Sequence, residues 1–162
     1  MTSEEKNQSN IINSELNLKY NRYIFANKPI NRFKTKPIVE DKSTKLDELR
    51  NEIENIKDCE LKKNASKIVF SDGSNRSKIM IVGEGPGQKE DREGKPFVGD
   101  AGLLLNKMLK SINIERKNVY ITNVVNYRPP NNRKPEPVEI TKYSNFLRKH
   151  ISIIDPKILI LM

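Results

Sequence analysis

The residues best suited to chemistry lie in one glycine-rich segment, Gly83 to Gly102, which reads G-E-G-P-G-Q-K-E-D-R-E-G-K-P-F-V-G-D-A-G. Its first five residues contain three glycines and a proline. Glycine lets the backbone approach a ligand closely, because no Cβ atom stands in the way. The segment also carries acidic residues, among them Glu84 and Asp91, and one aromatic ring, Phe97. These types suit charge stabilisation and stacking, so the segment predicts a ligand-binding turn.

The flanking residues indicate how this turn is positioned. Four consecutive apolar residues, 79–82, precede it and are typical of a strand buried on both faces. An amphipathic helix pattern follows at 103–112, so the order strand, turn, helix predicts a site at the carboxyl end of a parallel strand. The glycines fall at 83, 85 and 87, which differs from the G-x-G-x-x-G spacing of dinucleotide-binding domains. A P-loop is also disfavoured, because G-K-[ST] is absent.

The remaining patterns predict alternating helices and strands. We expect helices at 43–57, 101–111 and 136–151 and strands at 79–82, 119–122 and 157–162, with a turn at 71–74. For the helix at 101–111, Asp100 is the expected N-cap, and the side chains expected to point inward are Leu104, Leu105, Met108, Leu109 and Ile112. This order predicts an α/β fold of three layers, α/β/α, around a central parallel sheet that is incomplete at its C-terminus.

Composition sets the domain boundaries and the class of partner. The 162 residues suffice for one domain, which we expect at 44–162. Residues 1–43 are rich in Asn, Lys, Ser and Glu and are expected to form a disordered or linker tail, with a peripheral helix at 11–23 as the alternative. A net charge of +9 favours a polyanionic partner. No apolar stretch approaches bilayer length, and the single cysteine fits a reducing cytoplasm.

Three motifs resemble those of the family 4 uracil-DNA glycosylases. The family signature G-E-A-P-G-x-x-E-D-x-x-G-x-P-F-V-G-x-A-G-x-L-L is followed from Gly83 to Leu105, with Gly85 in the alanine position. A second motif, T-N-x-V-x-x-R-P-P-x-N-R-x-P, is matched from Thr122 to Pro135, and P-K-x-I/L appears at 156–159. The resemblance covers roughly 47–162. It implies a uracil-DNA glycosylase-like fold and base-excision repair, in which an enzyme flips uracil out of DNA and hydrolyses its N-glycosidic bond.

The resemblance also implies roles for individual residues. Phe97 would stack on uracil beside Gly85, and the Asn123 carboxamide would accept a hydrogen bond from N3–H while donating one to O4. Glu84, with Asp91 as the alternative, would act near the sugar. The residues that would contact DNA phosphates are Arg128, Arg133 and Lys134.

Structural alternatives remain open at each of these positions. Phe97 could be a core aromatic, Asn123 a turn or cap residue, and the basic loop an ordinary solvated surface. His150 is expected on a polar helix face exposed to solvent, and it is not the active-site histidine of the family, which belongs to a later motif.

The sequence departs from the family in two respects. Most members bind a [4Fe–4S] cluster through four cysteines, but the corresponding positions here are Ile56, Cys59, Tyr127 and Tyr143. We therefore predict no iron–sulfur cluster and no metal. The family's C-terminal H-P-S-x-L-L-type segment is also missing, so the chain resembles the N-terminal part of a glycosylase. Four expectations follow: feeble activity or an inactive relic that binds DNA weakly, a separate polypeptide that supplies the missing part, a cytoplasmic and nucleoid-associated location, and no membrane partner.

Overall fold

The computed structural model describes residues 41–162, so the predicted tail and the alternative helix at 11–23 lie outside the described residues, apart from 41–43. Within 41–43, helix α2 begins at Lys42, and the carboxylate of its N-cap Asp41 accepts a hydrogen bond from the Ser43 N–H. The helices and strands are α2 (Lys42–Glu54), α3 (Glu60–Asn64), β1 (Asp72–Gly73), β2 (Ile79–Gly83), α4 (Gln88–Glu93), α5 (Asp100–Ser111), β3 (Tyr120–Asn123), α6 (Pro137–Ile154) and β4 (Ile158–Leu161), with 3-10 turns at Arg116–Asn118 and Pro130–Asn132.

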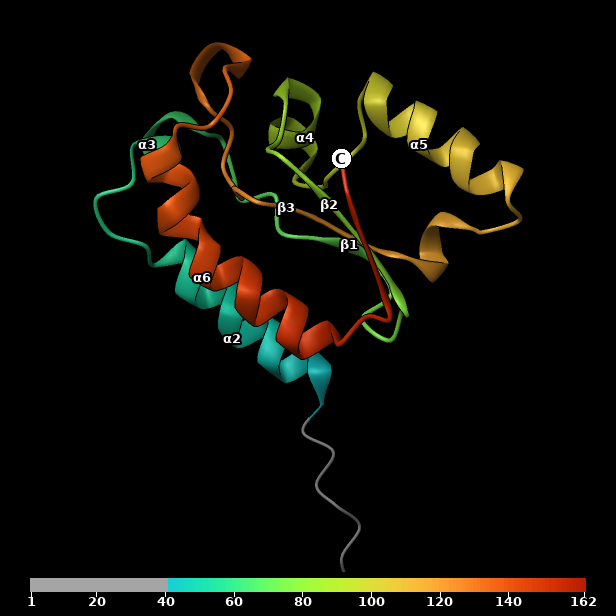
Figure 1. The fold of residues 1–162 in the computed structure, drawn as a ribbon. Helices are drawn as coiled ribbons and strands as arrows, with labels where there is room; N and C mark the ends of the chain where they lie inside the picture. Colours follow the sequence, from blue (N-terminus) through green and yellow to red (C-terminus); the bar gives the residue numbers. More distant parts are fainter. Residues whose placement is uncertain (1–40) are drawn as a thin grey trace, which may run out of the picture. The chain divides into compact units, whose positions relative to one another are not determined.

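The strands form one sheet in the order β1-β3-β2-β4 (Figure 1). β2 pairs in parallel with both β3 and β4, and its last residue, Gly83, is the register partner of Asn123 at the end of β3. The predicted turn at 71–74 contains the two-residue strand β1, which pairs antiparallel with β3. The register brings the glycine-rich turn and Asn123 to the same edge of the sheet, because parallel strands end on the same side.

Helices cover both faces of this sheet, which confirms the predicted three-layer α/β/α arrangement. Helices α2 and α6 lie side by side on one face and α5 lies on the other (Figure 1). Strand residues alternate between the two layers: Met80 and Val82 join the core with α2 and α6, whereas Ile81 joins the core with α5.

Helix α5 buries a narrower stripe than its sequence suggests. Leu105 and Leu109, one turn apart, are 3% and 5% exposed and pack against the sheet. The prediction was wrong for Leu104, Met108 and Ile112, whose exposed fractions are 59%, 52% and 62%. The reason is that the helix contacts the sheet along one line only. Its N-cap is Gly99 rather than Asp100, because the Gly99 carbonyl already accepts the first helical hydrogen bond, from the Leu103 N–H.

The prediction for His150 was also wrong. The side chain is 1% exposed, because α6 turns Tyr143, His150 and Ile154, spaced by seven and four residues, toward the core. Its ring centroid lies 4.6 Å from that of Phe70 and 5.9 Å from that of Tyr120, and Nε2 has no hydrogen-bond partner in the described part of the chain. Burial lowers the pKa of His150 to about 4, so the imidazole is neutral at physiological pH.

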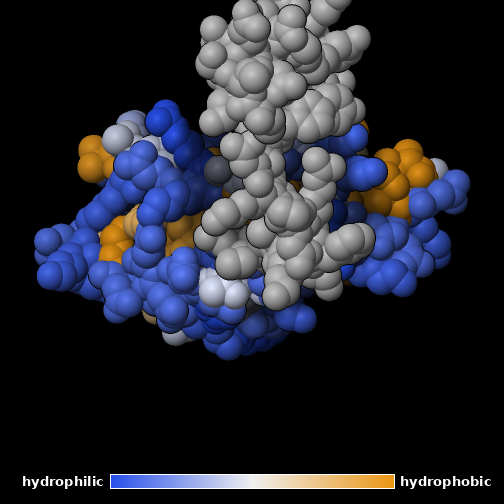
Figure 2. Space-filling view, turned by 90° about the horizontal axis from the view of Figure 1, so that it is seen from below, coloured by the Kyte–Doolittle hydropathy of each residue, from blue (hydrophilic) through white to orange (hydrophobic). Residues whose placement is uncertain are grey.

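Strand β4 lies at one end of the sheet order and exposes all four of its apolar side chains. Figure 2 shows hydrophobic side chains of the described residues at the surface in separate patches on a largely hydrophilic face. Among the described residues, no helix is both long enough and apolar enough to cross a bilayer.

Candidate functional site

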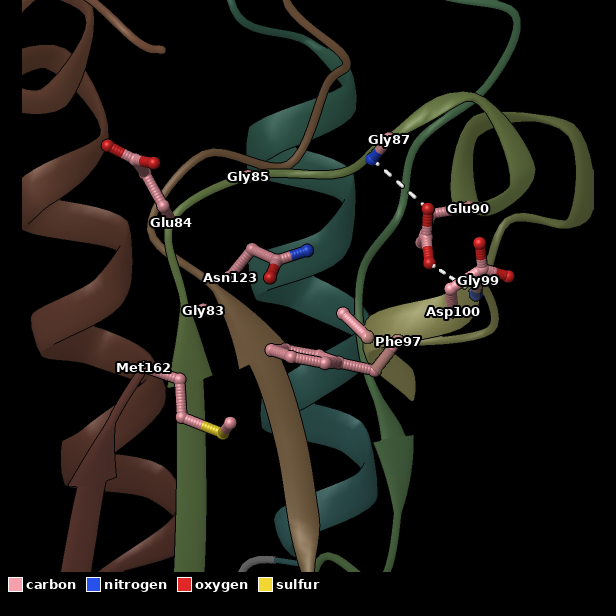
Figure 3. A pocket seen from close by; sticks show the side chains of 11 residues that line it. Gly83, Glu84, Gly85, Gly87, Glu90, Phe97, Gly99, Asp100, Asn123 and Met162 are labelled. Carbon is pink, nitrogen blue, oxygen red and sulfur yellow. Dashed lines mark hydrogen bonds between the residues drawn. The ribbon is translucent and has the colours of Figure 1, made fainter. Parts of the chain in front are cut away.

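A pocket of about 430 Å³ opens at the carboxyl ends of β2 and β3, where the sequence predicts a ligand site (Figure 3). Its residues come from the glycine-rich turn, the start of α5 and the ends of β3 and β4. They are Gly83, Glu84, Gly85, Gly87, Glu90, Phe97, Gly99, Asp100, Ala101, Asn123 and Met162. Among the residues that the structure describes, the lining therefore includes three carboxylate side chains and no Lys, Arg or His.

Phe97 and Asn123 converge above Gly83. A Cβ atom on Gly83 would lie 2.5 Å from Asn123 Oδ1 and 2.7 Å from the Phe97 ring, so only glycine leaves room for both side chains (Figure 3). Asn123 is 3% exposed, and its Nδ2 donor has no hydrogen-bond partner within the described residues. The end of the sheet thus presents a buried, unsatisfied amide donor beside an aromatic ring.

The Phe97 ring serves both the core and the pocket. It packs against the cluster of Ile81, Leu105 and Ile121 between α5 and the sheet, and it also lines the pocket. Its backbone has a φ of +52°, a left-handed conformation that costs a residue with a side chain about 1–3 kcal/mol. Tertiary contacts must offset this cost to hold the ring where it is.

Glu90 closes the glycine-rich segment on itself. One carboxylate oxygen accepts hydrogen bonds from the N–H groups of Val98 and Gly99, at 2.9 and 2.7 Å, and the other accepts one from Gly87, at 3.2 Å (Figure 3). Sequence reasoning missed this residue. The available signal was its place three residues after Gly87, the N-cap of α4, where an acidic side chain can accept the N-cap N–H, which is one half of a capping box.

The two predicted catalytic carboxylates lie in different places. Glu84 lines the pocket at its rim, but its exposed side chain points away from Phe97 and Asn123 (Figure 3). Asp91 is buried outside the pocket, where its Oδ1 accepts hydrogen bonds from the N–H groups of Ser66 (2.9 Å) and Lys67 (3.4 Å). Helical geometry explains the position of Asp91. It follows Glu90 in α4, and one residue step along a helix rotates the side-chain direction by about 100°.

The predicted DNA-contacting loop lies beside this pocket. A smaller cavity of about 130 Å³ is lined by Glu84, Gly85 and Gly87 together with loop residues that include Arg133 and Lys134. Arg133 binds the Glu139 carboxylate with two hydrogen bonds, at 2.8 and 2.7 Å, which raises the pKa of Arg133 and lowers that of Glu139. Arg128 donates to Asn132 Oδ1 at 2.7 Å, and the Lys134 side chain is exposed.

The positions that would hold an iron–sulfur cluster form a packed core instead. Cys59 is buried, and its Sγ atom lies 3.2 Å from the hydroxyl of buried Tyr143. Tyr127 is part of the same core and Ile56 packs against it. Burial is the main cause that raises the pKa of both tyrosines, that of Tyr127 to about 12. One thiol cannot hold a [4Fe–4S] cluster, and 41–162 contain no group of three or more His, Cys, Asp or Glu suited to a metal ion. These residues do not fit the cluster.

Comparison with known proteins identifies relatives over the same region. The sequence profile of the uracil DNA glycosylase superfamily matches residues 70–162. The chain is 48% identical over 116 residues to a type-4 uracil-DNA glycosylase of Sulfurisphaera tokodaii (71% of this chain, 53% of the relative). It is 44% identical over 115 residues to that of Archaeoglobus fulgidus (71% and 58%) and 46% identical over 102 residues to that of Thermotoga maritima (63% and 53%). The chain thus spans about half the length of these relatives.

Proposed function

Because the chain belongs to the uracil-DNA glycosylase superfamily, we propose that its pocket binds uracil flipped out of DNA and contributes to hydrolysis of the N-glycosidic bond. The observation that carries this proposal is the convergence of the Phe97 ring and the Asn123 amide above Gly83. An aromatic face and a carboxamide are the two groups that recognition of a single pyrimidine requires.

Asn123 would discriminate uracil from cytosine. Its Nδ2 would donate to uracil O4 while Oδ1 accepts from N3–H, and cytosine presents the opposite donor and acceptor at these atoms. The buried Nδ2 has no partner among residues 41–162, and an unsatisfied buried donor costs about 1–3 kcal/mol. Uracil would relieve this cost, whereas cytosine would leave Nδ2 facing another donor.

The charges around the pocket favour the positive charge that develops on the sugar, but not the negative charge that develops on the base. Bond cleavage leaves positive charge on the sugar and negative charge on the base. The carboxylates of Glu84, Glu90 and Asp100 would stabilise the cationic sugar. Glu84 is a better candidate than Glu90 for positioning the attacking water, because Glu90 already accepts hydrogen bonds from the backbone. The Glu84 side chain would have to rotate to reach that position. The departing base meets Asn123 Nδ2 but no cationic side chain from the pocket lining. We therefore expect slow excision by this chain alone.

A non-catalytic role is the second candidate, and the outward direction of the Glu84 side chain favours it. In that case the domain would bind uracil-containing DNA weakly without cleaving it. In either case Arg128 and Lys134 are the better candidates for phosphate contacts, because Arg133 is already bound to Glu139. We also propose the cytoplasm, at the nucleoid, as the site of action, because the proposed substrate is DNA.

We also propose that a separate polypeptide completes the site. Ile158 and Ile160 of β4 face the same side of the sheet as Ile81, because they are register partners of alternate residues of β2, and they are exposed. The exposed Leu104 and Met108 of α5 belong to the same layer. A partner with a matching apolar surface would cover these side chains and could bring a cationic group to the departing base.

An excision assay tests the proposal. A single-stranded oligonucleotide with one uracil is incubated with the protein, and abasic sites are cleaved by alkali. We expect slow formation of product that Asn123→Ala abolishes, whereas Asn145→Ala, a substitution at an exposed position of α6, leaves it unchanged. Equal rates for both variants would contradict the proposal. Saturable binding of the uracil strand without product would favour the non-catalytic candidate.

A further inference from the structure

Arg116, which is not among the residues that line the pocket, donates hydrogen bonds to the backbone of the turn that carries Phe97. It begins the 3-10 turn between α5 and β3, and its side chain is 22% exposed. Nη2 donates to the carbonyl of Pro96 at 2.7 Å, and Nη1 donates to the carbonyl of Phe97 at 3.0 Å. The same guanidinium donates through Nε to Asp72 Oδ2 at 2.7 Å and through Nη1 to Asn106 Oδ1 at 3.1 Å.

The carbonyls that Arg116 binds belong to a strained part of the turn. Phe97 has a positive φ, and such a conformation persists only where surrounding contacts determine it. On the helix side, Gly102 leaves room for the turn, because a Cβ atom there would lie 1.9 Å from the Phe97 carbonyl oxygen. Space at Gly102 permits the conformation, and the hydrogen bonds from Arg116 favour it.

Asp72 fixes the guanidinium in turn. It lies in β1, which pairs with β3, so the ion pair connects the Phe97 turn to the sheet. The planar guanidinium presents donors in several fixed directions, which suits two successive carbonyls and a carboxylate at once. A lysine ammonium would keep the charge but could not reproduce this fork.

We propose that Arg116 is a positioning residue for uracil recognition, which holds the Phe97 ring at the pocket through the carbonyls of Pro96 and Phe97. The inference rests on the proposed function of the pocket. Arg116 acts through Phe97 and touches no ligand. Its loss therefore weakens stacking while the Asn123 amide stays in place.

Two measurements test this role. The first places 4-fluorophenylalanine at position 97 and records its ¹⁹F NMR signal in the full chain without ligand. Arg116→Gln and Arg116→Lys are expected to shift or broaden the signal, and Arg148→Gln, at an exposed position of α6, is expected to leave it unchanged. An unchanged signal in both Arg116 variants would overturn the proposal, whether or not the protein binds uracil. Arg116→Lys keeps the charge and serves if Arg116→Gln does not fold.

The second measurement is a double-mutant cycle on the affinity for uracil. Arg116→Gln and Phe97→Leu are each expected to weaken binding about tenfold, and the double variant no more than Phe97→Leu alone, because both remove the same contact. Losses that multiply to about a hundredfold would show that Arg116 acts independently of the ring and would overturn the inference. If the Arg116 variants alter the ¹⁹F signal but the wild-type chain binds no uracil, the proposed function is refuted and the role of Arg116 in positioning the Phe97 ring stands.

Discussion

At the scale of single residues, the site depends on a missing Cβ atom at Gly83. Gly83→Ala would place a methyl group 2.5 Å from Asn123 Oδ1 and 2.7 Å from the Phe97 ring, so one of these side chains must move. We expect a loss of uracil affinity of at least tenfold, with a destabilisation of about 1–3 kcal/mol from overpacking. Titration with uracil and urea unfolding measure the two effects. Asn145→Ala, at an exposed position of α6 outside the pocket, is the control variant. Equal affinity for both variants would refute the assignment.

His150 predicts how stability depends on pH. Its pKa falls from 6.5 to about 4 on folding, so the unfolded chain binds more protons between these values. The contribution to stability is therefore complete above pH 6.5 and is lost as the pH falls toward 4, at up to about 1.4 kcal/mol per pH unit. Urea unfolding between pH 7 and pH 4 should show a smaller loss for His150→Leu than for the wild type. Identical pH profiles of unfolding free energy for the two proteins would disprove this role of His150.

At the scale of elements, sequence periodicity predicted the three longer helices and the three parallel strands in their order, but not the short helices α3 and α4 or how much of each helix is buried. The apolar residues of α5 occupy more than one side, and only the line through Leu105 and Leu109 meets the sheet. A pattern of residue types does not show which side of a helix has a neighbour. The same reason explains the wrong prediction that His150 is exposed. Histidine is a polar residue type, but α6 directs this side chain into the core.

Adjacent residues of α5 give a matched test of this packing. Leu105→Ala removes a side chain that is 3% exposed and should lower the free energy of unfolding by about 2–4 kcal/mol. Leu104→Ala, at 59% exposed, should change it by less than about 0.5 kcal/mol. Urea unfolding of the two variants gives both values. Similar losses would mean that Leu104 is covered in solution.

At the scale of the whole molecule, the strand ends were predictable and the hydrogen-bond network was not. The sequence predicted a ligand site at the end of the strand at 79–82, and parallel pairing of β2 with β3 brings Asn123 to the same edge of the sheet. Arg116 was missed because its contacts join segments that only the fold brings together. Glu90 contacts its own glycine-rich segment, and its place three residues after Gly87 was the signal that could have found it. Asp91 was proposed from its neighbourhood in the sequence, and its hydrogen bonds to Ser66 and Lys67 lie on the other side of α4.

The core around Cys59 predicts the metal content of the molecule. Because one buried thiol, hydrogen-bonded to Tyr143, occupies the region that four cysteines would need, we expect protein purified anaerobically to contain no stoichiometric iron and no visible absorbance. Metal analysis and an absorption spectrum provide the check. About four irons per chain would contradict the expectation, and Cys59→Ser would show whether the thiol is a ligand.

The most direct test of the account is an NMR titration that follows the side-chain amide of ¹⁵N-labelled Asn123. With uracil, we expect a saturable shift of the Nδ2 protons together with ring-current shifts from Phe97, and with cytosine at the same concentration we expect neither. Shifts of equal size for both bases, or an Asn123 amide that responds to neither, would contradict the claim that this pocket recognises uracil.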